Sequence, residues 1–261
     1  MSQTVVLNAG DYEALLRKHV RNWIFWGDEV GTDYWLIAGG GTGQLGSAQG
    51  ELASEHGWTT TSIAANAVGS GADFMVASDK GTPSEFTQNA QNDLIKSPAI
   101  FGDWAHAYQA MILLHKKELP RYLIADFICR FSVEANNQPT TAVGFVEDGG
   151  SIVTAADHMG AITSNSGTWG LSVNGSEGTA FATADTGVHL FRLVMDKALG
   201  RIYPGVDGTM YNGNNGSTDG SLAITADEFP VAFGAGSGGA NNLVQLSQAH
   251  VFYAWRVPYF V

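Results

Sequence analysis

Apolar and polar residues alternate along much of the second half of the chain, as they do in strands that bury one face. Between His189 and Met195, odd-numbered residues fall on one face and even-numbered residues on the other. Similar runs recur at short intervals with Gly, Asn or Asp between them, which is typical of an all-β sandwich. The pattern predicts strands at residues 34–37, 58–65, 73–77, 122–134, 141–147, 151–155, 160–164, 168–173, 178–183, 188–195, 201–206, 209–211, 222–225, 229–234 and 246–257.

Several turns between these strands are marked by residues that accept positive φ. The dipeptides at 174–175 (Asn-Gly) and 207–208 (Asp-Gly) suit tight hairpins, and Gly200 closes another turn. Pro204 lies within the strand predicted at 201–206. Because proline donates no ladder hydrogen bond, we expect this strand to lie at an edge or to carry a bulge.

The last predicted strand should lie deep in one sheet. It would bury four alternate residues on one face, namely Val251, Tyr253, Trp255 and Val257. Cys129 is the only cysteine, so no intramolecular disulfide can form. Its place within a strand pattern favours an inert core thiol over a nucleophile.

A helical period occurs in two places nearer the N-terminus. Residues 11–26 carry an apolar stripe at i, i+3, i+4 and i+7 spacing, and Asp11 can cap the start of such a helix. The sequence Thr-Pro-Ser-Glu at 82–85 has capping-box spacing. We therefore predict an N-terminal helix at 11–26 and a short helix near 83–95.

We expect residues 1–30 to form a helical arm and residues 31–261 to form a single sandwich domain. The arm either packs across one end of the sandwich or inserts into a neighbouring subunit. Its end is apolar on all sides, and exposed apolar surface of this kind usually marks an interface. We therefore predict a homo-oligomer such as a trimer, with contacts at Trp23, Phe25 and Trp26.

The stretch Gly187–Tyr211, GVHLFRLVMDKALGRIYPGVDGTMY, resembles the laminin-G and concanavalin A-like jelly-roll families. In those families a strand ending in Arg-Leu-Val precedes a variant of Tyr-Val-Asp-Gly, from which Pro204 departs. Residues 121–134 are similar to an early strand of the same families, and residues 248–257 to their closing strand. The resemblance implies an all-β, two-sheet antiparallel jelly roll, here with an added N-terminal helix. Bacteriophage structural proteins often contain such domains.

Composition narrows the choice of partners. The chain is 44% hydrophobic, carries a formal net charge of −12 and shows no basic patch, which argues against nucleic acid and anionic membranes as partners. No apolar run is long enough to span a bilayer. Residues 1–10 lack the features of a signal peptide, so we expect a protein made in the host cytoplasm and carried in a virion.

Motifs that support catalysis are absent from the sequence. There is no alternating carboxylate motif of a retaining glycosidase, no HxH or HExxH, and no GxSxG. The glycines at 39–43 are not followed by the Lys-Ser/Thr of a phosphate-binding loop. Asp126 should pair with Arg130 on the same face of its strand. We predict a protein that is not an enzyme and has no catalytic residues, metal site or cofactor.

Sugar binding is the one kind of site that the sequence still offers. Exposed aromatic rings stack well on sugars, and the chain has tryptophans in or beside its predicted strands. Trp169 follows a polar turn that includes Asn165, and we choose it as a glycan platform, although a core position is the alternative. Asp157 and His158 adjoin a strand in a turn-rich region. They either help to hold a sugar or a calcium ion or belong to an ordinary solvated turn.

Three function classes remain open. The first is a virion structural protein, a bacteriophage capsid decoration or tail-associated component that binds viral capsid or tail proteins. The second is a lectin-like module that binds a cell-surface glycan. The third is a glycoside hydrolase or lyase whose site has no recognisable motif. The absence of catalytic motifs and disulfides favours the first class.

Overall fold

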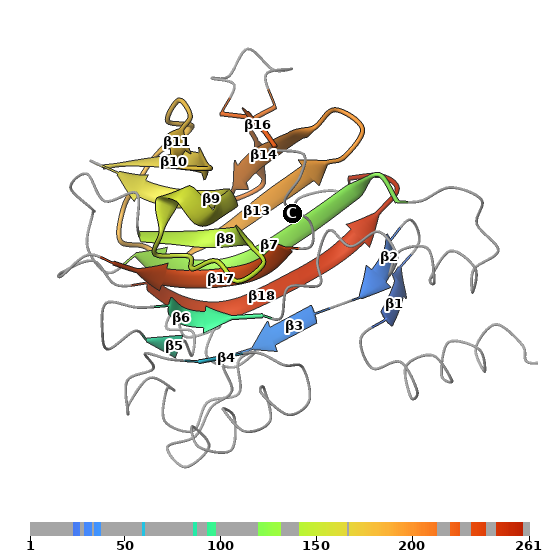
Figure 1. Ribbon diagram of the computed structural model, residues 1–261, viewed down its shortest axis with the longest axis horizontal. Helices are drawn as coiled ribbons and strands as arrows, with labels where there is room; N and C mark the ends of the chain where they lie inside the picture. The colour runs from blue at the N-terminus through green and yellow to red at the C-terminus, as the bar shows by residue number, and fades with distance from the viewer. Residues whose placement is uncertain are drawn as a thin grey trace, which may run out of the picture.

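The computed structural model describes residues 23–26, 29–32, 34–37, 59–60, 86–87, 93–97, 120–131, 141–165, 167–212, 220–224, 231–238 and 244–257. Their strands form two antiparallel sheets that face each other, as Figure 1 shows. The all-β, two-sheet sandwich predicted from the sequence is confirmed. The division into an arm and one sandwich domain stays a prediction.

The first sheet contains ten of the described strands. Its main path runs β1 (Trp23–Trp26), β2 (Glu29–Thr32), β18 (Val244–Ala254), β7 (Tyr122–Phe131), β13 (His189–Asp196), β14 (Arg201–Val206) and β15 (Thr209–Met210). Three further strands pair with members of this path, namely β3 (Tyr34–Ile37), β5 (Phe86–Thr87) and β16 (Leu222–Ala223). The long strands β18, β7 and β13 lie side by side at its centre (Figure 1).

The second sheet contains eight of the described strands. Its path runs β11 (Ser176–Glu177), β10 (Thr168–Val173), β9 (His158–Asn165), β8 (Thr141–Glu147), β17 (Val231–Ser237), β6 (Asp93–Lys96) and β4 (Thr59–Thr60), and β12 (Ala182–Thr183) pairs with β10. Strands distant in sequence are neighbours in both sheets, as β8 and β17 illustrate. Pairing of this kind is expected of a jelly roll.

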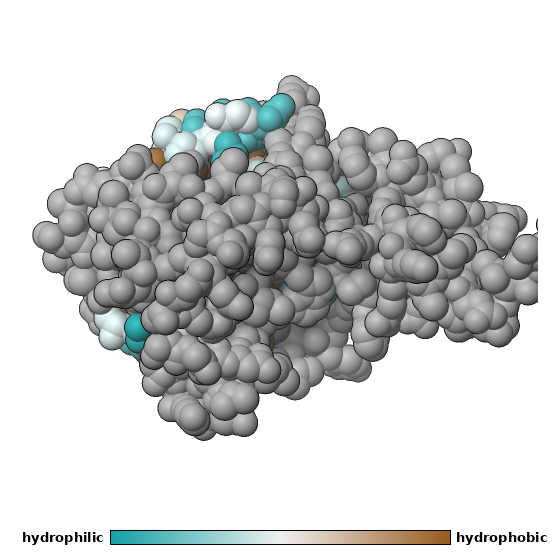
Figure 2. Space-filling view, turned by 90° about the horizontal axis from the view of Figure 1, so that it is seen from below, coloured by the Kyte–Doolittle hydropathy of each residue, from teal (hydrophilic) through white to brown (hydrophobic). Residues whose placement is uncertain are grey.

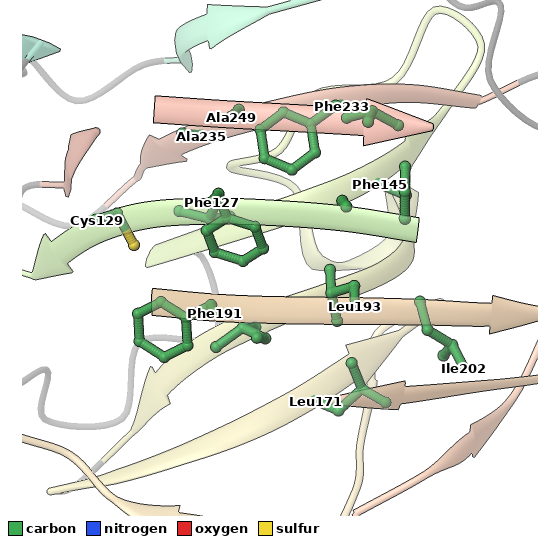
Figure 3. Packing of buried hydrophobic residues seen from close by; sticks show 14 of the residues in the cluster. Phe127, Cys129, Phe145, Leu171, Phe191, Leu193, Ile202, Phe233, Ala235 and Ala249 are labelled. Carbon is green, nitrogen blue, oxygen red and sulfur yellow. The ribbon is translucent and has the colours of Figure 1, made fainter. Parts of the chain in front are cut away.

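The hydrophobic core lies between the sheets and is rich in phenylalanine (Figure 3). The Phe127 ring stacks on Phe191 within the first sheet, with ring centroids 5.5 Å apart. It also meets Phe233 of the second sheet at 5.5 Å. Cys129 is buried on the same face, which confirms the predicted core thiol. Aromatic contacts across the gap therefore join the two layers.

The tight turns form at the residues where the sequence predicts them. Asp207 and Gly208 have φ values of 47° and 84°, as the predicted hairpin requires, and Gly200 has a φ of 60°. Pro204 lies in β14, which is next to the end of the sheet, and the described strands on its outer side are the two-residue strands β15 and β16. On that side the Pro204 carbonyl accepts the backbone N–H of Tyr211 at 3.0 Å, and the pairing with β15 ends there because proline has no N–H to donate in return.

Some predicted elements are wrong. Trp23–Trp26, the end of the predicted helix, forms strand β1 paired with β2. Strand Phe86–Thr87 lies within the second predicted helix, and strand Asp93–Lys96 overlaps its end. Aromatic and β-branched residues favour strands once a partner strand is available, and here tertiary pairing overrides the local helical pattern. Residues 11–22, the rest of the N-terminal helix, and residues 73–77 lie outside the described part of the chain.

Two predictions in the second half need smaller corrections. The strand predicted at 151–155 is a turn at 151–154 that leads into a 3-10 helix at Ala155–Asp157. The closing strand ends at Ala254, so only Val251 and Tyr253 of the predicted buried face lie in the core. Trp255 is half-buried, and Val257 is exposed. The strand ends before these residues can continue the alternation.

Candidate functional site

The outer face of the first sheet, the one directed away from the core, carries the polar and aromatic residues that form a candidate site. Strand register sets them in rows. Tyr122 lies opposite Asp196, and Val194 lies opposite Tyr203. Because alternate residues share a face, Asp126 and Asp196 lie on the same outer face as Tyr122.

A charge pair between a buried arginine and a partly exposed aspartate lies within this face. Arg192 donates from Nε and Nη2 to the two carboxylate oxygens of Asp126, at 2.6 and 2.5 Å. The two residues are direct cross-strand neighbours, and the Arg192 side chain is only 5% exposed. The predicted partner of Asp126 was Arg130, on its own strand. The cross-strand arginine matches the carboxylate more closely, because its planar fork forms two parallel hydrogen bonds.

A pocket of about 330 Å³ opens on the same face. Strands β7, β13, β14 and β15 and the segments next to them supply its lining, which includes Arg121, Tyr122, Asp196, Tyr203, Met210 and Asn212. Tyr122, Tyr203 and Met210 pack against a small apolar cluster formed by Ile124, Val194, Phe252 and Ala254. The pocket therefore combines an apolar floor with polar groups at its wall.

Arg121 and Asp196 form the polar wall of the pocket. Arg121 donates from Nε and Nη2 to the two oxygens of Asp196, at 2.8 and 2.6 Å. The Asp196 side chain is 3% exposed, whereas that of Arg121 is 41% exposed. Asp196 also accepts hydrogen bonds from the backbone N–H groups of Ala198 and Leu199 at 2.9 and 3.2 Å. The buried carboxylate therefore fixes both the turn and an accessible guanidinium.

Tyr122 lies beneath this guanidinium. The guanidinium carbon of Arg121 is 5.1 Å from the centroid of the Tyr122 ring, within the range of a cation–π contact. The hydrogen bond to Asp196 raises the pKa of Arg121 above its ordinary value, so the group stays charged. Burial raises the pKa of Tyr122, so its hydroxyl stays protonated and can donate a hydrogen bond.

The predicted glycan platform, Trp169, is placed differently. It lies on the core side of β10 and is 3% exposed, with its ring 5.0 Å from Phe191 and 4.5 Å from His189. A buried ring cannot stack on a sugar at the surface. The prediction is corrected: Trp169 is a core residue, because the polar turn before it precedes a strand whose alternation directs the indole inward.

The other predicted glycan residues do not join Trp169 in a surface site. His158 is fully buried, and its two ring nitrogens contact the Ser172 hydroxyl at 2.9 Å and the Ile152 carbonyl at 2.8 Å. Asp157 accepts a hydrogen bond from the backbone N–H of Ser151 at 2.8 Å. Burial lowers the pKa of His158, which suits a neutral structural imidazole. The side chain of Asn165 lies outside the described part of the structure.

Trp23, Phe25 and Trp26, the predicted contacts between subunits, lie on strand β1. Their side chains lie outside what the structure describes, so their role in association stays a prediction. Within the described ranges, no helix is long and apolar enough to cross a membrane. Among the same residues, no three His, Cys, Asp or Glu side chains gather closely enough to hold a metal ion.

Sequence reasoning missed the pocket because its residues are far apart in the chain. Arg121 and Tyr122 begin β7, whereas Asp196 ends β13 and Tyr203 lies within β14. Only the register brings them together. The available signal was the polar or aromatic character of alternate positions, Tyr122 and Asp126 among them, within strands that otherwise read as apolar.

No model of a known protein family matches the chain, and no curated protein sequence matches it either. Several solved structures have a similar arrangement of strands. A carbohydrate esterase from the Shiga toxin-encoding bacteriophage phi24B is 14% identical, with a TM-score of 0.48 over 84% of this chain and 97% of that chain. Peanut lectin is 12% identical, with a TM-score of 0.40 over 67% of this chain and 88% of the lectin.

Trypanosoma rangeli sialidase is 11% identical, with a TM-score of 0.42 over 66% of this chain and 26% of the sialidase. The prediction that the chain is not an enzyme is corrected here, because proteins matched by their structure include a carbohydrate esterase and a sialidase. These likenesses concern the arrangement of strands, and no activity is transferred from them to this chain.

Proposed function

We propose that this chain is a glycan-binding, lectin-like module whose sugar site is the pocket on the outer face of the first sheet. The observation that carries the proposal is the combination in one pocket of two tyrosine rings, Tyr122 and Tyr203, with the anchored guanidinium of Arg121. A sugar presents apolar C–H faces and hydroxyl edges, and this pocket offers a complement to both.

The polar wall supports the recognition of hydroxyl groups. Two N–H groups of Arg121 are used by Asp196, and the guanidinium carries further donors that can reach a bound hydroxyl. Asn212, also in the lining, has a side chain with both donor and acceptor atoms. Because Asp196 holds Arg121 in place before binding, little conformational entropy is lost when a ligand binds.

The size and charge of the pocket suggest the kind of sugar. A volume of about 330 Å³ lies near the lower end of the range for small-molecule sites. It favours a monosaccharide or disaccharide unit over a long chain. The charges of Arg121 and Asp196 balance within the pocket. We therefore expect a neutral sugar unit.

The experiment is a glycan array probed with the wild-type chain and with Tyr203→Ala. The matched control is Val188→Ala, which shortens an exposed apolar residue that is not among the pocket lining. We expect neutral glycans to bind the wild type and the control equally, and Tyr203→Ala to lose about tenfold in affinity, or about 1.4 kcal/mol. Absence of any glycan binding by the wild type would overturn the proposal, as would equal binding by all three proteins.

We also propose that the module acts in a virion, as a capsid decoration or a tail-associated component that binds a cell-surface glycan. The support comes from the sequence, namely the acidic composition and the resemblance of Gly187–Tyr211 to jelly-roll families that occur in bacteriophage structural proteins. Self-association, for example as a trimer, and binding to capsid or tail proteins belong to the same proposal. Electron microscopy of a native particle carrying labelled chain tests it. A chain found only apart from particles would contradict it.

A further inference from the structure

A three-residue ionic cluster lies at the other end of β13 from the turn anchored by Asp196. The His189 ring contacts carboxylates on both sides. Its Nδ1 is 2.7 Å from Oδ2 of Asp207, and its Nε2 is 2.8 Å from Oδ1 of Asp185. The His189 side chain is 15% exposed, whereas the two aspartates are more than half exposed. The imidazole thus lies largely out of solvent between two charged groups.

This arrangement specifies the protonation state of the ring. An ionised carboxylate only accepts hydrogen bonds, whereas a neutral imidazole has one donor nitrogen and one acceptor nitrogen. Both ring nitrogens of His189 can donate to carboxylates only when the ring is an imidazolium. A neutral ring would place one lone pair against a carboxylate and lose one of the two hydrogen bonds.

The cluster connects three separate parts of the chain. Asp207 lies in the turn of the β14–β15 hairpin, and its Oδ1 accepts the backbone N–H of Leu190 on β13 at 3.0 Å. The backbone N–H of Asp207 donates to the Leu190 carbonyl at 2.8 Å. Asp185 accepts the N–H of Gly187 at 2.6 Å in the segment before β13. His189 therefore joins the segment before β13 to the β14–β15 hairpin turn.

We propose that Asp185, His189 and Asp207 form a pH-dependent clasp that holds the β14–β15 hairpin turn and the segment before β13 together, and that loosens when His189 loses its proton. Among the residues that the structure describes, the other groups that face the His189 ring are apolar or weakly polar. Trp169 and Phe191 contact it at centroid distances of 4.5 and 5.9 Å. Cys129, directly opposite on β7, is a buried thiol.

The clasp has a consequence for the sugar pocket, and this step rests on the proposed function. The hairpin that begins at Asp207 continues into β15, which supplies Met210 to the pocket, and Asn212 follows. β15 has two residues, and among the described strands it pairs with β14 alone. Loosening the turn would thus free one wall of the pocket, and we expect the affinity for sugar to fall as the pH rises.

The direction of the pH effect follows from how the pKa of His189 and the pKa of Asp185 are shifted in the folded chain. Burial lowers the pKa of His189, but the hydrogen bonds and charges of Asp185 and Asp207 outweigh it, so the pKa lies above its ordinary value. Stability from His189 is fully present below about pH 6.5, its value in unfolded chains, and is lost as the pH rises through the folded-state pKa. The hydrogen bond from His189 lowers the pKa of Asp185. The stability that the ionised Asp185 contributes is therefore lost only as the pH falls into the acid range.

The test compares the thermal unfolding temperature of the wild type with that of His189→Gln from about pH 5 to about pH 9. Glutamine keeps one hydrogen-bond donor but cannot gain the charge. We expect the wild type to unfold at a higher temperature below about pH 6.5, and the difference to shrink as the pH rises above that value. A difference that stays constant with pH would overturn the clasp.

A second measurement keeps the proposal testable if His189→Gln fails to fold. Nuclear magnetic resonance of the histidine rings in the wild type gives the His189 titration directly, and the double variant Asp185→Asn and Asp207→Asn is its comparison. We expect a midpoint above about pH 6.5 that falls in the double variant. A wild-type midpoint at or below that value would overturn the clasp. Neither measurement uses a sugar, so failure of the proposed function leaves both results unchanged.

Discussion

The outer faces of the two sheets differ in the size and chemistry of their residues. On the second sheet, the outer cluster is small and apolar, and it consists of Ala142, Val146, Ala161 and Ala232 with Ile152 packed against them. On the first sheet, the outer face carries tyrosines and two arginine–carboxylate pairs. Where described residues reach the surface in the view of Figure 2, most are coloured from white to teal.

This difference indicates that the outer face of the second sheet contributes to stability, whereas the outer face of the first sheet is suited to recognition. Small side chains on the second sheet allow Ile152, from the connection between β8 and β9, to close over them. The two carboxylates on the first sheet are fixed by arginines, Asp126 by its cross-strand neighbour Arg192 and Asp196 by Arg121 and the turn backbone. A rigid polar face of this kind is suited to binding, because its side chains are positioned before the ligand arrives.

The largest expected effect comes from placing a charge on the small apolar face. Ala232 is fully buried, so Ala232→Asp would bury a carboxylate among apolar neighbours. We expect a loss of more than about 3 kcal/mol in the free energy of unfolding, measured with urea, or no soluble protein. Ala223→Asp is the control, because Ala223 is an exposed residue of β16 and should change stability little. A mild effect of Ala232→Asp would show that the face is open to solvent.

A smaller effect is expected from breaking the Asp126–Arg192 charge pair on the outer face of the first sheet. Asp126→Asn leaves the 5% exposed Arg192 without its carboxylate and should cost about 2–4 kcal/mol in urea unfolding. The double variant Asp126→Leu and Arg192→Met removes both charges and should recover most of that loss. If the double variant is as unstable as the single one, the pair itself contributes stability beyond the cost of an unpaired charge.

The smallest effect is expected at Trp255, just beyond the end of the closing strand, and Tyr253 within the strand is its comparison. Tyr253 is fully buried, and Tyr253→Ala should cost about 3–5 kcal/mol in urea unfolding. Trp255 is half-buried beyond the end of β18, so Trp255→Ala should cost only about 1–2 kcal/mol. Equal losses of stability at the two positions would show that Trp255 is buried, as the sequence predicted.

Local patterns in the sequence were sufficient to predict most of the fold. The strands at 141–147, 168–173 and 201–206 have the predicted bounds, because alternation and turn residues agree there. The N-terminal prediction failed where a helical apolar stripe ended in aromatic residues that pair as β1. The periodicity of one segment does not reveal that a partner strand from elsewhere in the chain will pair with it.

The candidate site was much less accessible to sequence reasoning. Trp169 combined an aromatic ring with a neighbouring polar turn, but alternation directs that ring into the core. The pocket residues carry no motif, and Arg121 and Tyr203 meet through the register of three strands. Long-range register is set by the packing of the whole sandwich, and a single sequence does not display it.

The most direct test of the sugar site is a crystal structure of the chain with the best glycan from the array. We expect a sugar ring against Tyr203 or Tyr122, with hydroxyls within hydrogen-bond distance of Arg121. The site would then lie on the outer face of the first sheet, as its anchored polar groups suggest. A sugar bound elsewhere on the molecule, with the pocket between Arg121 and Met210 empty, would contradict the proposal.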